Sequence, residues 1–100
     1  EFTTYAIRHP EIRRRVAKEH RRIVAAVARS LEEASERTGA TLALPARNLA
    51  LMLTAIGSGV RIERDLDPDD TPTDLMETAM ELLIRAAARK RARLVKGAAR

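Results

Sequence analysis

A long stripe of regularly spaced side chains constrains the fold of this chain more than any other feature of its sequence. The stripe follows Pro10, and its mostly apolar members recur every three or four positions, which is the spacing of one helix face. They are Ile12, Val16, His20, Ile23, Val27, Leu31 and Ala34. Proline suits the first turn of a helix, and Gly39 suits the left-handed residue that ends one. The sequence therefore predicts a helix of about 28 residues, on the order of 40 Å long.

Three more helices are predicted around this one. A short helix runs from Phe2 to Arg8 and ends there because the residue before Pro10 is pushed away from helical dihedrals. After a connector from Thr41 to Leu44, a third helix runs from Pro45 to about Asp65. Its apolar positions have helical spacing, and few polar residues separate them before Arg61. These positions are Leu49, Met52, Leu53, Ile56 and Val60.

The fourth helix is predicted to begin at Thr71-Pro72, because Thr71 and Asp74 have the spacing of a capping box. Its apolar face is wide, and the helix is expected to continue into the basic tail from Arg89 to Arg93. The fold class is therefore all-α: one domain over residues 1–100, with a short first helix and three long ones. The last two helices carry more apolar surface than the long helix can cover, so either further chain or a second copy is expected to cover the rest.

Small residues interrupt the third helix at Gly57-Ser58-Gly59, where each glycine costs about 1 kcal/mol relative to alanine. A close helix crossing and a simple kink explain this step equally well. The three methionines are expected to fill gaps in the core first and to line a pocket or interface second.

The composition excludes several classes of protein. Cysteine is absent, which removes disulfides and thiolate chemistry and fits a reducing cytoplasm. The longest charge-free stretch, from Asn48 to Val60, is shorter than the roughly 20 apolar residues that a membrane span requires. There is no signal peptide pattern, and a chain that starts without Met inside an apolar helix is compatible with a fragment.

Charge is distributed unevenly, with a net charge of +5. Lys and Arg dominate residues 8–22 and 85–100, whereas residues 63–81 hold eight carboxylates and one Arg. Solvated helix faces explain such runs best. Contact with nucleic acid phosphates through Arg13, Arg14, Arg15 and the basic tail is the alternative.

No catalytic or metal constellation is predicted, and no cofactor is expected. The two histidines, His9 and His20, lack the helical spacing to a second ligand that a metal pair needs. His20 lies on the apolar stripe, where a hydrogen-bonded core histidine is the first interpretation and a polar contact to a ligand is the second. The acids around Asp67 fail the calcium-loop pattern, because Asp70 occupies the position that requires glycine.

Two stretches of the chain resemble the C-terminal half of TetR-family transcription regulators. The first is Tyr-Ala-x-Arg-x-Pro-Glu-x-Arg, from Tyr5 to Arg13, followed by the long helix that ends at Gly39. The second begins at Leu49 with Leu-Ala-Leu-Met-Leu-Thr-Ala-Ile-Gly-Ser-Gly-Val and continues to Asp65-Leu-Asp-Pro-Asp, a Thr-Pro step and a Leu-rich last helix. The resemblance spans nearly the whole chain.

The resemblance implies a cytoplasmic, homodimeric bacterial repressor whose C-terminal domain senses a small apolar effector. Operator DNA is then bound by an N-terminal helix-turn-helix domain that is absent from this chain. The last two helices are expected to form a dimeric four-helix interface, for which the resemblance nominates Leu53, Ile56, Gly57, Val60, Met76, Met80, Leu83 and Ala87. The nominated effector contacts are Tyr5, His20, Val24 and Met52.

The main alternative to this function is a stand-alone helical dimerisation or interaction module without a ligand. An enzyme is the least expected class, because no acid, base and nucleophile converge in the predicted arrangement.

Overall fold

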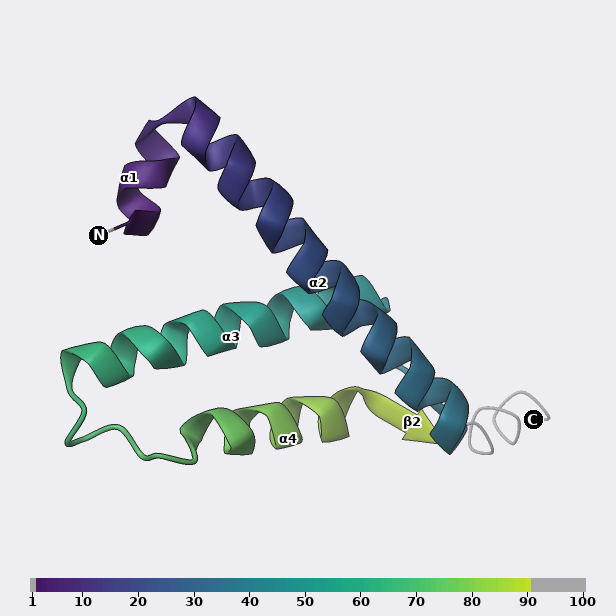
Figure 1. Ribbon diagram of the computed structural model, residues 1–100. Coiled ribbons are helices and arrows are strands. Elements are labelled where there is room, and N and C mark those ends of the chain that lie inside the picture. The colour runs from purple at the N-terminus through teal and green to yellow at the C-terminus, as the bar shows by residue number, and fades with distance from the viewer. Residues whose placement is uncertain (1, 91–100) are drawn as a thin grey trace.

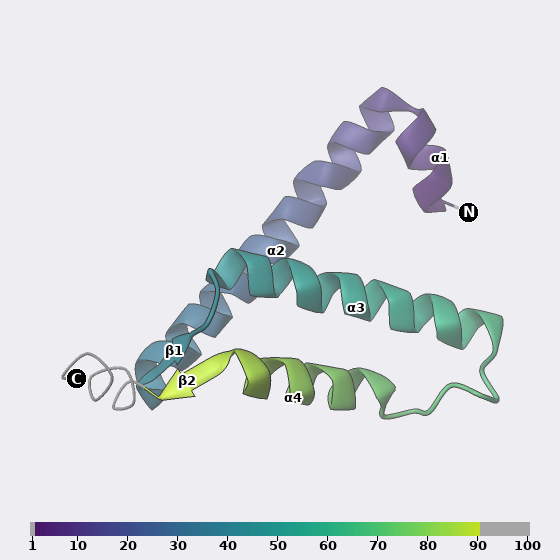
Figure 2. The same ribbon diagram turned by 180° about the vertical axis from the view of Figure 1, so that it is seen from behind.

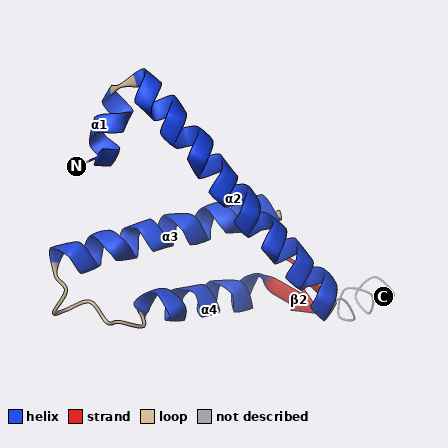
Figure 3. Cartoon of the chain, in the orientation of Figure 1, coloured by secondary structure: helices blue, strands red, loops and turns tan. Residues whose placement is uncertain are grey.

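The computed structural model describes residues 2–90 and is built almost entirely of helices (Figures 1 and 3). The helices are α1 (Phe2–Arg8), α2 (Pro10–Thr38), α3 (Ala46–Leu66) and α4 (Leu75–Ala87). Two three-residue strands, β1 (Ala40–Leu42) and β2 (Ala88–Lys90), are the remaining regular elements of this part of the chain. The all-α fold class and the order of four helices are confirmed.

Helix α2 has the boundaries that its sequence predicts. Its 29 residues start at Pro10 after an extended His9, and its end is formed by Gly39, whose φ of 74° is left-handed. The Gly39 N–H donates to the Ser35 carbonyl oxygen at 2.9 Å, which satisfies one of the carbonyls that the helix end leaves free. Local capping chemistry was therefore sufficient to place both ends of this helix.

The segments on either side of the α3–α4 pair differ from the prediction. The predicted connector after Gly39 contains β1, which pairs antiparallel with β2, so that Thr41 lies opposite Arg89. The predicted continuation of the last helix into a basic tail is wrong at Ala88, where the backbone becomes extended. Cross-strand hydrogen bonds replace the helical ones here, and the Ala43 N–H also donates to the Ala87 carbonyl oxygen at 2.7 Å. Residues 91–93 of the predicted tail lie outside the described residues.

The predicted start of the fourth helix is also wrong. Helix α4 begins at Leu75, no side-chain cap is formed by Asp74, and the helix has only 13 residues. The Thr71 hydroxyl instead donates to the carbonyl oxygens of Asp67 at 2.7 Å and Glu63 at 3.2 Å. Thr71 therefore caps the end of α3, whose last carbonyls lack partners within the helix.

The core lies where α2 crosses the α3–α4 hairpin. One cluster joins Val24 and Ala28 of α2 to Ala50 of α3, and a second joins Leu49 and Leu53 of α3 to α4. Val27 and Leu31 of α2 pack against both clusters. Leu49 and Val24 are the largest fully buried side chains among the described residues, so the core is small.

The molecule has an open V shape. Beyond the crossing, the first half of α2 diverges from α3, and α1 folds back toward the end of α3 (Figures 1 and 2). The radius of gyration is 17.1 Å, whereas a compact domain of this length has about 13 Å. The open end of the V therefore holds surface that the chain itself leaves unpacked.

Candidate functional site

A cavity of about 820 Å³ that is open to solvent lies at the open end of the V, between α1, the first half of α2 and the second half of α3, and most of its lining side chains are exposed. The turn at His9-Pro10 brings α1 back beside α2, so that the buried Ala6 contributes to the lining. Pockets that hold small molecules measure about 300–1,000 Å³. The cavity is thus of a size that a small organic molecule can occupy.

The lining combines an apolar wall with a few polar groups. Each of the three helices around the cavity contributes apolar residues to its lining. These residues are Ala6, Ile7, Val16, Ala17 and Ile62. The polar groups come from α2 and α3 and are Arg13, His20, Ser58, Arg61 and Asp65. None of these charged side chains forms an ion pair with a described residue. The ion pairs in the described part of the chain join Arg22 to Glu19 and Arg85 to Glu81. An apolar lining with a few unpaired polar groups is typical of ligand sites.

The structure places the four nominated effector contacts in different surroundings. His20 lines the cavity. The ring of Tyr5 stacks on that of His9 with centroids 3.9 Å apart, and the His9 Nδ1 lies 2.7 Å from the Tyr5 carbonyl oxygen. Val24 is fully buried in the core one turn below His20, and Met52 lies exposed on α3 outside the cavity lining. Only His20 of the four therefore lies in the cavity.

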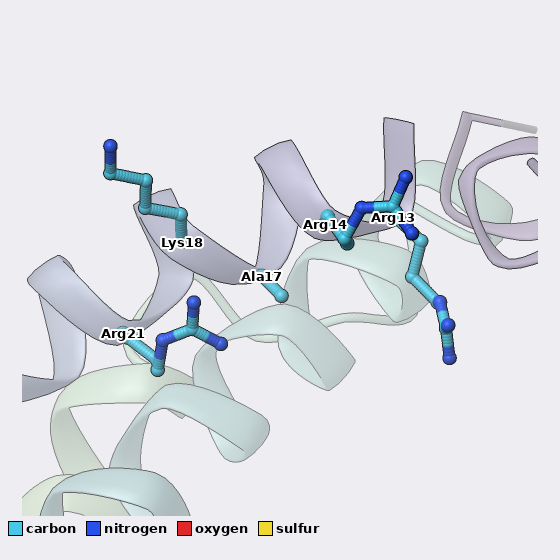
Figure 4. A pocket seen from close by; sticks show the side chains of 5 residues that line it. All are labelled: Arg13, Arg14, Ala17, Lys18 and Arg21. Carbon is cyan, nitrogen blue, oxygen red and sulfur yellow. The ribbon is translucent and has the colours of Figure 1, made fainter. Parts of the chain in front are cut away.

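A basic surface adjoins the cavity on α2. It consists of Arg13, Arg14, Lys18 and Arg21, whose side chains spread outward around Ala17 (Figure 4). All four side chains are exposed, and none forms an ion pair with a described residue. Because Arg13 and Ala17 belong to both features, the positive potential of this surface extends to the edge of the cavity.

Most of the nominated interface residues hold α3 against α4 within one chain. Leu53 and Ala87 are buried in the second core cluster, and Met80 and Leu83 pack against it. A Cβ added to Gly57 would lie 3.4 Å from the Met76 Cε, an ordinary van der Waals distance, so the Met76 side chain of α4 packs beside this glycine. Val60 is buried and Ile56 is half-buried.

Other apolar residues of the same two helices remain uncovered, and we call them the outer faces. On α3 they are the exposed Met52, Ala55, Gly59 and Leu66. On α4 they are the half-buried Leu75 and Ala79 and the exposed Leu82 and Ala86. Leu66 is 76% exposed, Leu82 62% and Met52 43%. The chain therefore uses one apolar face of each helix internally and leaves a second one open.

Sequence reasoning missed the α3 side of the cavity. Ser58 and Ile62, like Arg61 and Asp65, are four residues apart and so share a strip of the helix surface. The sequence alone shows this spacing, and it could have indicated that these four side chains lie on one side of the helix. Nothing local indicated that the first half of α2 would diverge and leave the strip facing a cavity.

In the described part of the chain, no three potential metal ligands gather in one place. Nor is any described helix long and apolar enough to cross a membrane.

A comparison with protein families identifies one match. The family model of the C-terminal domain of BetI-type transcriptional repressors matches residues 1–89. No significant match was found among curated proteins or among solved structures.

Proposed function

Because this chain belongs to the family of BetI-type transcriptional repressor C-terminal domains, within the TetR family, we propose that it is the effector-sensing and dimerisation domain of a repressor. In this proposal the repressor acts in the cytoplasm, and its operator is bound by a helix-turn-helix domain of the full-length protein. The family consists of regulators, which are non-enzymatic in general. The family establishes a repressor C-terminal domain, and we propose the effector site and the dimer interface described below.

The cavity is the observation that carries the proposal. One of its walls is the second half of α3, from Ser58 to Asp65, and the same helix carries an outer face through Met52 and Gly59. A ligand that contacts α3 from the cavity thus acts on the helix that a second copy would contact from outside. Effector binding then shifts the dimer between two arrangements through its different affinity for each.

A second copy is proposed to cover the outer faces of α3 and α4. This assignment differs from the residues nominated from sequence, because most of those already pack α3 against α4. An exposed apolar stripe on each of two neighbouring helices is expected at a four-helix interface. Leu82 and Met52 are the large side chains at the centre of this proposal.

Ligand binding is tested with a small-molecule library in a thermal-shift assay on two matched variants. Ser58→Trp places a large side chain in the cavity, whereas Ala26→Trp places it on an exposed position of α2 outside the lining. A compound at about 100 times its Kd stabilises the folded state by about 2.7 kcal/mol. Such a shift is expected for the unsubstituted chain and Ala26→Trp but not for Ser58→Trp. Equal shifts for both variants would place the ligand elsewhere.

Dimerisation is tested by light scattering on Leu82→Lys, with Glu77→Lys as the control on another side of α4. We expect Leu82→Lys to be monomeric, since a buried lysine ammonium without a partner is strongly unfavourable. Glu77→Lys is expected to remain dimeric. If the unsubstituted chain is monomeric even when concentrated, the interface is wrong. If it dimerises but no compound binds, the stand-alone dimerisation module is the better function.

A further inference from the structure

We propose that the cavity takes an amphiphilic molecule with one anionic head group, held between Arg13 of α2 and Arg61 of α3. This inference rests on the proposed function and adds the chemical class of the effector. It also departs from the expectation of a purely apolar effector.

The residues that line the cavity carry more positive than negative charge. Two arginines, Arg13 of α2 and Arg61 of α3, line the cavity, and Asp65 is the one residue with a carboxylate among the lining residues. Asp65 lies four residues after Arg61 on the same helix, yet the two side chains form no ion pair. One added negative charge would therefore balance the lining. A carboxylate or similar oxyanion is the group that guanidinium binds through charge-assisted hydrogen bonds.

The surroundings of the cavity strengthen the preference for an anion. The basic surface on α2 adds Arg14, Lys18 and Arg21 next to Arg13, with no ion-pair partner in the described residues. Charges of one sign beside a recess raise the local concentration of oppositely charged ligands. An anion is thus favoured during its approach as well as in the cavity.

The apolar part of the lining requires an apolar body on the ligand. Five apolar side chains from three helices form that wall, and burying a hydrocarbon body there removes apolar surface from water. A bare inorganic anion would leave this wall uncovered. The hydroxyl of Ser58 and the imidazole of His20 can each donate one further hydrogen bond to an oxyanion.

A cationic amphiphile is disfavoured by the same lining. Quaternary ammonium groups bind best against aromatic faces. No Phe, Tyr or Trp ring is present among the residues that line the cavity, and the ring of Tyr5 is stacked on His9. A cation would also be repelled by both guanidinium groups.

The experiment compares three probes with the same ten-carbon chain: decanoate, 1-decanol and decyltrimethylammonium. Binding is measured by calorimetry below the concentration at which micelles form. Arg13→Gln/Arg61→Gln removes both lining charges. Arg29→Gln/Arg64→Gln is the matched control, because it removes two exposed charges from the same two helices outside both the cavity lining and the basic surface.

We expect decanoate to bind the unsubstituted chain more tightly than the other two probes. The lining pair is expected to weaken decanoate binding by about tenfold or more, and the control pair by less than about twofold. The affinity for 1-decanol should be the same in all three proteins, which shows that the cavity itself is intact.

Two results would overturn the inference. One is binding of decyltrimethylammonium as tight as that of decanoate, and the other is an equal loss of decanoate binding in both pairs of variants. If library compounds stabilise the unsubstituted chain but not Ser58→Trp, and decanoate does not bind, the anionic class of the effector is wrong and the proposed function stands. If nothing binds in the cavity, both are wrong.

Discussion

The two halves of α2 carry the same kind of apolar stripe but have different surroundings. In the second half, Val27 and Leu31 of the stripe pack on both core clusters, next to the buried Val24 and Ala28. In the first half, Val16 is 39% exposed and Ile23 is 50% exposed, although they continue the stripe at helical spacing. A periodic stripe thus identifies the face of a helix that avoids water, but the tertiary structure decides whether that face meets a core or a cavity.

Removing apolar atoms from each end of the V tests whether the two ends differ in packing. Leu49→Ala empties the closed end, where the side chain is fully buried, and is expected to cost about 2–5 kcal/mol of unfolding free energy. Val16→Ala at the open end is expected to cost less than about 1 kcal/mol, because its side chain already contacts water. Chemical denaturation followed by circular dichroism measures both. Similar losses would mean that the open end is packed in solution.

Two glycines test the backbone at the same two ends. Gly39→Ala is expected to cost about 1–2 kcal/mol, because the left-handed φ at the end of α2 crowds a Cβ. Gly59→Ala in α3 is expected to stabilise the chain by about 0.5–1 kcal/mol, because the residue is helical and its Cβ would meet open space. Thermal unfolding in dilute solution measures both variants. A destabilising Gly59→Ala would show that another backbone approaches there.

The wall of the cavity on α3 depends on how its end is held. Thr71→Val keeps the shape of the side chain but removes the hydroxyl that donates to Asp67 and Glu63, so a loss of about 1 kcal/mol is expected. Thr71→Ser retains a hydroxyl and should lose less. Hydrogen exchange of the last turn of α3 gives the local readout, and unchanged protection in Thr71→Val would contradict this role.

The smallest effect is expected at the ion pair in the diverging half of α2. The Arg22 Nη1 lies 3.4 Å from the Glu19 Oε2, and both side chains are largely exposed. Arg22→Ala should change the unfolding free energy by less than about 0.5 kcal/mol. A loss above about 1 kcal/mol in denaturant titrations would mean that this surface is buried in the dimer, and that the first half of α2 is less open than it is in the single chain.

The prediction was most accurate where the signals are local. The boundaries of α2 follow from Pro10 and Gly39, and α3 begins one residue from its predicted start. The prediction failed where a distant segment competes for the same groups. Thr71 was expected to cap the helix that follows it. Instead, the loop after α3 places the Thr71 hydroxyl next to the free carbonyl oxygens at the end of α3, and it donates to them.

The candidate site was harder to predict than the helices. His20 was selected because a polar residue interrupts an apolar stripe, and it does line the cavity. Val24, one turn later and next to the stripe residue Ile23, is core, because α3 crosses α2 at that turn. Arg61 and Ile62 were not selected, since their importance depends on what lies opposite them across the V. The position of a helix crossing is a long-range property that spacing alone does not encode.

The all-α class, the family resemblance and the ends of the longest helix could be predicted from the amino-acid sequence alone. Periodicity and capping act within a few residues, so they can be recognised without knowing the fold. The tertiary structure decided which apolar faces of α3 and α4 are used internally, which remain open, and where the stripe of α2 faces a cavity. The burial of each apolar face depends on where the helices cross. The core is small and aliphatic, so it covers only part of the apolar surface of each helix.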